Sequence, residues 1–260
     1  QITIPSSVNV IEGSVFFFIC RFVELIDKYT FTGCTSLSKV LIPDSVTTIE
    51  SHAFCGCESL EQISIPSSVK DISDGVFEQC TKLTQITIPP RVYSISDRTF
   101  NGCKSLKQIS FYNNVESFGC ASFNGCLSLE QIEIPSSMIN IYTGAFYECK
   151  SLKKIVIPSS VRKIENHAFA NCSNLSEVSF EEPSSLAFIG DSCFLNCSSL
   201  MKIGIPKCVT EIGKQIFSGC TCLTEVTIPS VVYKLLSLAP SFVKIILFPN
   251  ILELNQKQNL

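Results

Sequence analysis

The residues of this 260-residue chain that could do chemistry are its 15 cysteines and two histidines. The motifs Cys55-Gly-Cys57 and Cys220-Thr-Cys222 have a spacing that suits two thiolate ligands, but a structural zinc ion needs about four ligands close together. The two motifs lie far apart in the sequence, as do His52 and His167. The sequence also has no glycine-rich phosphate loop, Gly-x-Ser-x-Gly elbow or His-Glu-x-x-His motif. It therefore predicts no catalytic residue, no metal site and no cofactor, and a protein that is not an enzyme.

The composition describes a folded chain with little net charge. Hydrophobic residues make up 45% of the chain and charged residues 17%, and there are 19 phenylalanines but no tryptophan. Such a chain has ample apolar surface to bury in a core. The formal net charge of -3 cannot produce the basic field that non-specific binding to nucleic acid requires. Nucleic acid is therefore not an expected partner.

A Phe-x-x-Cys pair recurs along most of the chain. The spacing between successive pairs is 23 residues, except for 25 residues between Phe169 and Phe194, where residues 180–186 leave room for a two-residue loop. Sequence repeats of this period are typical of stacked structural units. The nine pairs are Phe31/Cys34, Phe54/Cys57, Phe77/Cys80, Phe100/Cys103, Phe123/Cys126, Phe146/Cys149, Phe169/Cys172, Phe194/Cys197 and Phe217/Cys220.

Each repeat contains one segment with the pattern of a strand. Residues Gln62–Ile65 alternate polar and apolar side chains, which predicts a half-buried strand that ends at Pro66. The rest of the repeat, Val69–Cys80, has apolar residues at short helical spacings and predicts a turn or a single helical turn on the outer wall. Burying about six large side chains gains roughly 9–18 kcal/mol, whereas ordering about 23 residues costs roughly 23–46 kcal/mol. No repeat is expected to fold alone, so the repeats must stack into a continuous solenoid.

We expect residues 1–260 to form a single solenoid of about ten units. Residues 1–30 are predicted to be degenerate N-terminal repeats with a strand at 2–4, residues 31–230 regular repeats, and residues 231–260 a degenerate C-terminal cap and tail. Val243–Leu247 is predicted as the last strand. The apolar stretch 231–254 contains Lys234, Lys244 and Glu253, so we interpret it as a final repeat and expect no membrane span. The start has no signal pattern, which indicates an excised fragment or a removed leader.

The consensus of the repeat resembles a known family. The pattern Ile-Pro-x-Ser-Val-x-x-Ile-x-x-x-Ala-Phe-x-x-Cys, seen at Ile157–Cys172 and Ile42–Cys57, resembles the BspA-like leucine-rich repeats of bacterial and protist surface proteins. The resemblance covers about residues 31–230, although Ser68 and Val69 stand where the general leucine-rich repeat has Asn or Cys. It implies an α/β-repeat solenoid with a parallel sheet on its concave face. It also implies protein–protein contacts, cell adhesion and attachment to host or matrix proteins.

The exposed positions of the predicted strands form two columns on that face. Neighbouring strands lie about 4.8 Å apart, so four consecutive Gln amides could hydrogen-bond to one another along the stack. Alternatively, this uncharged strip with its Ser and Thr neighbours is a docking surface for a protein or a glycan. The predicted ligand-binding residues are Gln62, Ser64, Gln85, Thr87, Gln108, Ser110, Gln131, Glu133 and Lys154.

The cysteines leave the location of the protein open. The nine repeated cysteines fall at one phase of an apolar pattern and are expected to be small buried side chains with free thiols. The remaining six share no phase, and an odd total of 15 cannot pair completely, which favours a reducing compartment. The family resemblance favours the cell surface or secretion. The leading hypothesis is a monomeric surface adhesion module, and the alternative is a cytoplasmic scaffold for protein–protein interaction.

Overall fold

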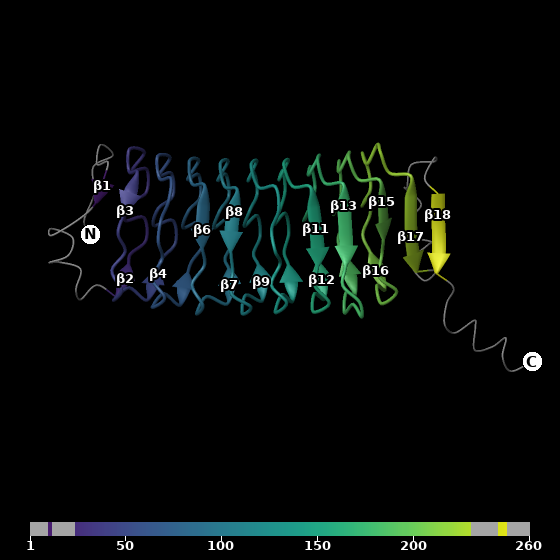
Figure 1. The fold of residues 1–260 in the computed structure, drawn as a ribbon, viewed down its shortest axis with the longest axis horizontal. Helices are drawn as coiled ribbons and strands as arrows, with labels where there is room; N and C mark the ends of the chain where they lie inside the picture. Colours follow the sequence, from purple (N-terminus) through teal and green to yellow (C-terminus); the bar gives the residue numbers. More distant parts are fainter. Residues whose placement is uncertain (1–9, 12–23, 230–243, 249–260) are drawn as a thin grey trace, which may run out of the picture.

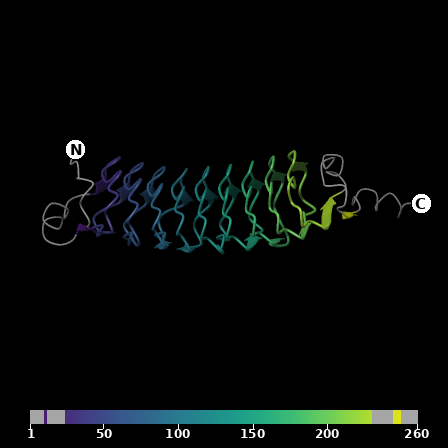
Figure 2. The ribbon, with the colours of Figure 1, turned by 90° about the horizontal axis from the view of Figure 1, so that it is seen from above.

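The computed structural model describes residues 10–11, 24–229 and 244–248. These residues form an elongated ladder in which the strands of successive turns lie side by side (Figure 1). Seen from above, the turns follow one another in a single row (Figure 2). The predicted solenoid of parallel strands is therefore confirmed. No helix forms among the described residues, so the α component of the predicted fold is not found in this part of the chain.

The first strand of each turn builds one face of the ladder, here called the first-strand face. All pairings are parallel, and Gln85 lies beside Gln108, one 23-residue period further along. Single bridges from Leu41 to Ser64 and from Gln62 to Gln85 continue the pairing between β3 and β6. The strands are β1 (Val10–Ile11), β3 (Lys39–Val40), β6 (Gln85–Thr87), β8 (Gln108–Ser110), β11 (Lys154–Ile157), β13 (Glu177–Phe180), β15 (Lys202–Gly204), β17 (Glu225–Pro229) and β18 (Lys244–Phe248).

A second short strand in each turn builds the opposite column, here called the second-strand face. The sequence predicted one strand per repeat, so this second strand corrects the prediction. Each is two residues long, too short for an alternating pattern to stand out in the sequence. The strands are β2 (Leu25–Ile26), β4 (Thr48–Ile49), β5 (Asp71–Ile72), β7 (Ser94–Ile95), β9 (Ser117–Phe118), β10 (Asn140–Ile141), β12 (Lys163–Ile164), β14 (Phe188–Ile189) and β16 (Glu211–Ile212).

The phenylalanines of the repeat form a continuous column through the core. All nine are buried, and each ring stacks on the ring of the next turn. The distance between ring centroids runs from 4.9 Å for Phe31 and Phe54 to 6.0 Å for Phe194 and Phe217. Each ring thus covers the apolar face that a single turn would leave exposed, which is why the stack folds as a unit.

The repeated cysteines form a second buried column beside the rings. Each thiol from Cys57 onward donates a hydrogen bond to the carbonyl of a phenylalanine one turn back, such as Cys103 Sγ to Phe77 O at 3.1 Å. The prediction of buried thiols that form no disulfide is confirmed for all nine. Burial raises their pKa, to about 12 for Cys57 and for Cys220. A thiol is favoured here because it is small and apolar and still supplies a donor to an interior carbonyl.

The turn around each phenylalanine contains two residues with left-handed backbone. In one turn these are Arg98 (φ 55°) and Gly102 (φ 74°), and in the next they are Ala121 (φ 54°) and Gly125. The tight turn directs its amides at the carbonyls of the following turn, for example Phe100 N to Ser122 O at 2.8 Å. Non-glycine residues adopt this conformation at a cost of about 1–2 kcal/mol, which the contacts between turns must offset.

Only some of the predictions about the two ends of the chain fall on residues that the structure describes. The predicted last strand is confirmed as β18, one residue further along. The predicted strand at 2–4 lies outside the described residues, as do residues 12–23, 230–243 and 249–260. Among the residues that the structure describes, no helix is long and apolar enough to cross a membrane. The division into degenerate ends and regular repeats stays a proposal.

Candidate recognition surface

The four glutamines of the predicted site lie in one column on the first-strand face. Gln62 lies beside Gln85, and Gln85 beside Gln108, and all of them are exposed, as is Gln131. No hydrogen bond joins their side-chain amides to one another in the described part of the chain. The ladder of amides that the sequence allowed is therefore not formed. Each amide offers a donor and an acceptor to a molecule on this face.

The other predicted residues lie on the same face. Ser64, Thr87, Ser110 and Glu133 form the neighbouring exposed column, and Lys154 is the exposed first residue of β11. Beyond Gln131 the same column continues with four charged residues of alternating sign, namely Lys154, Glu177, Lys202 and Glu225. Ion pairs form between Lys154 Nζ and Glu177 Oε1 at 2.6 Å and between Lys202 Nζ and Glu225 Oε2 at 3.8 Å. The face thus has a glutamine half and a half whose charges neutralise each other.

The pairing of the first-strand face is interrupted where these two halves meet. Residues 131–134 form no strand, and β8 and β11 end separate sheets. A groove of about 920 Å³ lies over the interruption. It contacts five of the nine predicted residues: Gln108, Ser110, Gln131, Glu133 and Lys154. The other four, Gln62, Ser64, Gln85 and Thr87, lie on the earlier turns of the face, away from the groove.

An irregular turn explains the interruption. Phe111 and Phe118 occupy positions where the other turns have mostly isoleucine, and Tyr112 replaces the usual proline. The ring of Phe111 lies 5.3 Å from that of Phe118, and Phe118 lies 5.2 Å from Phe123 of the stacked column. Two additional rings in one layer are too bulky for the regular spacing of the strands, since a packed interior has little free volume. The departure from the Ile-Pro consensus at 111–112 was the sequence signal of this groove, and the sequence analysis did not use it.

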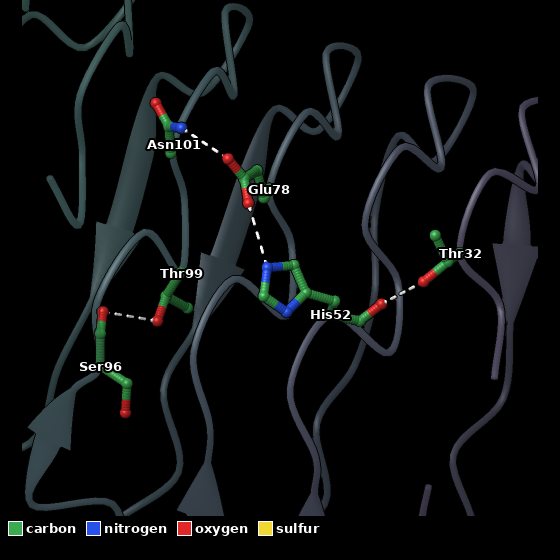
Figure 3. A network of polar contacts seen from close by, with 6 residues as sticks. All are labelled: Thr32, His52, Glu78, Ser96, Thr99 and Asn101. Carbon is green, nitrogen blue, oxygen red and sulfur yellow. Dashed lines mark hydrogen bonds and ion pairs between the residues drawn. The ribbon is translucent and has the colours of Figure 1, made fainter. Parts of the chain in front are cut away.

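A second polar cluster lies at the edge of the ladder (Figure 3). His52 Nε2 lies 3.4 Å from Glu78 Oε2, and Asn101 Nδ2 donates to Glu78 Oε1 at 2.7 Å. The His52 ring also stacks on Tyr29, with 5.5 Å between the ring centroids. His52 and His167, which lie far apart in the sequence, are both half-buried. The cluster links three successive turns, and its contacts are those of a structural network.

The cysteine motifs do not form a metal-binding arrangement. In Cys55-Gly-Cys57 the thiol of Cys57 points into the core and donates to Phe31 O at 3.2 Å. No group of three potential ligands in the described residues is arranged to hold a metal ion. Among the cysteines that the structure describes, Cys208 and Cys222 are the exposed ones, and both are free.

A family model matches the repeated part of this chain. The family model for the BspA type leucine rich repeat region (6 copies) matches residues 24–153 and 140–247. A leucine rich cell surface protein from Faecalibacterium prausnitzii is similar in structure, with 25% identity over 97% of this chain and 89% of that chain and a TM-score of 0.47. A leucine-rich repeat protein from T. pallidum has 26% identity over 85% of this chain and 80% of that chain, with a TM-score of 0.46.

A leucine-rich repeat protein from Bacteroides ovatus shares 23% identity over 95% of this chain and 83% of that chain, with a TM-score of 0.43. No curated protein matches the sequence. The family match spans most of the chain and every described turn from β2 to β17. The chain therefore belongs to the BspA-type leucine-rich repeat family, whose repeats build protein-interaction modules.

Proposed function

We propose that this protein is a non-enzymatic recognition module that acts as a monomer on the cell surface and attaches to host or matrix proteins. The observation that carries the proposal is the column of four exposed glutamines, whose amides have no hydrogen-bond partner in the described chain. They are held on a stack with a continuous buried core. A preorganised surface loses little conformational entropy on binding, which favours affinity.

The chemistry of the face favours a protein ligand. Amide side chains at strand spacing match the alternating donors and acceptors of a polypeptide, and a glycan offers hydroxyl groups that the same amides can bind. The chain has a net charge of -3, and Lys154 on this face is already paired with Glu177. The face therefore has no basic field that would attract a polyanion. A protein is therefore the first partner to test, with a glycan as the second.

The double variant Gln85→Ala/Gln108→Ala tests the site. Each lost hydrogen bond costs about 0.5–1.5 kcal/mol, so binding should weaken roughly 5- to 150-fold. The measurement is surface plasmon resonance against a panel of purified matrix and host-surface proteins and their glycans. The matched control is Ser94→Ala/Ser117→Ala, a pair in the same register on the second-strand face, which should leave binding unchanged. Unchanged affinity in the glutamine variant, with the fold intact by circular dichroism, contradicts the site assignment.

The alternative function is a cytoplasmic scaffold for protein–protein interaction. The free, exposed thiols of Cys208 and Cys222 favour it, because exposed thiols persist in a reducing compartment. A membrane-impermeant maleimide added to intact source cells separates the two functions, since both thiols are accessible to it. Labelling of the protein before lysis supports the surface. Labelling only after lysis supports the scaffold and removes the adhesion proposal.

A further inference from the structure

We propose that the groove between β8 and β11 receives an extended, largely uncharged segment of a partner protein. This inference rests on the proposed function, since it names the partner's chemistry at one place on the first-strand face. The groove's volume of about 920 Å³ lies within the range of about 300–1,000 Å³ that is common for ligand clefts. The groove lies at the irregular turn of Phe111, where the pairing of the first-strand face is interrupted among the described residues.

The first argument is the set of backbone groups without a partner. Between other turns the equivalent ladder bonds form, as in Lys107 N to Thr84 O at 2.9 Å and Lys153 N to Glu130 O at 3.1 Å. In the described chain, no backbone hydrogen bond links residues 107–111 to residues 130–134. Ser110 O accepts from Ile88 N on the preceding turn, so the backbone groups of Ile109 point to the interruption.

These backbone groups border the groove. Ile109 and Ile132 both line it and are 7% and 8% exposed as whole residues, and the alternating burial of β8 places the side chain of Ile109 on the core side. The groove therefore contacts these residues at their backbone. Backbone donors and acceptors at strand spacing, flanked by the amides of Gln108 and Gln131, are the groups that bind an extended main chain.

The second argument is the apolar part of the lining. Phe111 and Ile134 are only partly buried, and Val156 is 38% exposed. Together Phe111, Ile134 and Val156 give the groove an apolar part next to its amides, and interface energy concentrates where a side chain of the partner fills such a pocket. The apolar lining residues can therefore pack against one apolar side chain of the segment.

The third argument is charge. Two lysines, Lys107 and Lys154, and two glutamates, Glu133 and Glu181, line the groove, so it has no net charge. Lys154 is already paired with Glu177, and Glu181 Oε2 accepts from Ser159 N at 3.2 Å. A strongly charged chain would find no complementary field here, which is why the segment is expected to be uncharged at its centre.

The test uses a phage-displayed library of random linear dodecapeptides, selected on the purified wild-type chain. Ser110→Trp fills the groove from β8, and Leu41→Trp is the control, at an exposed position of the same phase on an earlier turn that does not line the groove. Enriched peptides should bind the control within about two-fold of the wild type and bind Ser110→Trp at least about ten-fold more weakly. They should carry an apolar residue at a constant position. Circular dichroism and the thermal midpoint verify that both variants are folded.

Amide hydrogen exchange gives a second readout that does not depend on a variant. The amide of Ile109 should exchange rapidly in the free protein and slow at least about ten-fold with a selected peptide bound, while the paired amides of β11 stay unchanged. Peptides that bind Ser110→Trp as well as the wild type overturn the inference, as do a failed selection and enrichment of highly charged peptides only. None of these results affects the Gln85/Gln108 experiment with whole proteins, so the two proposals can fail separately.

Discussion

Replacing Phe100 with alanine should reveal how strongly the turns depend on one another. The ring is fully buried, and its centroid lies 5.7 Å from Phe77 and 5.5 Å from Phe123. Removing it leaves a cavity in the middle of the stack, which costs about 3–5 kcal/mol in the free energy of unfolding. That cost is a large share of the total stability of an ordinary domain, about 5–15 kcal/mol.

The position of the ring in the array sharpens this prediction. Phe217 is equally buried, but among the described residues its ring has one stacked neighbour, Phe194. In a linear array each unit contacts only its neighbours, so a damaged end turn can unfold alone. Phe217→Ala should therefore cost roughly half as much as Phe100→Ala and broaden the transition. Phe100→Leu, which preserves most of the volume, should cost less than about 1.5 kcal/mol.

The assay is urea denaturation followed by far-ultraviolet circular dichroism, because the chain has no tryptophan to report by fluorescence. The free energy comes from linear extrapolation of the transition. A loss below about 1 kcal/mol for Phe100→Ala would show that neighbouring turns relax into the space and that the column does not couple them. Equal losses at Phe100 and Phe217 would refute the nearest-neighbour reasoning.

Three further predictions follow from the described contacts. Burial raises the pKa of Cys57 from 9.0 to about 12, so the unfolded thiol ionises first and stability should fall as the pH rises from 9 to 12; urea midpoints measure this, and Cys57→Ala should lower the slope by the share of one thiol, since the pKa of the other buried thiols is raised too. In native protein a thiol reagent should modify Cys208 and Cys222 rapidly and the nine repeated cysteines only in denaturant, as peptide mass spectrometry would show. Ala121→Gly relieves a left-handed backbone and should stabilise the protein by about 0.5–1 kcal/mol, whereas Ala145→Gly, at a buried position with ordinary backbone, should destabilise it in the same thermal assay.

The sequence predicted the parts of the fold that repeat. Nine recurrences of Phe-x-x-Cys establish the period, and the alternation at Gln62–Ile65 indicates which side chains face outward. The structure confirms the buried rings, the buried thiols and the exposure of all nine predicted contact residues. These features depend only on the phase of a residue within its own repeat, which can be seen in the sequence.

The features that the sequence analysis missed depend on contacts between turns. The strand at Asp71–Ile72 is two residues long and exists because the preceding turn pairs with it. The contact of His52 with Glu78 joins residues 26 positions apart, at different phases of the repeat. The groove arises from the combined volume of Phe111 and Phe118 against the neighbouring layer. The pattern of residues within one repeat does not show which side chains of neighbouring turns will contact each other.

The backbone hydrogen bonds between turns have a mechanical consequence. Bonds such as Phe54 N to Val76 O, at 3.0 Å, run from one turn to the next and therefore lie along the long axis of the ladder (Figure 1). A pulling force applied between the two ends loads these bonds in series, so the turns should yield one at a time. Each yielding turn of 23 residues frees roughly 80 Å of contour length. Under load the molecule would behave as an extensible tether that absorbs work in steps and recoils when the force is removed.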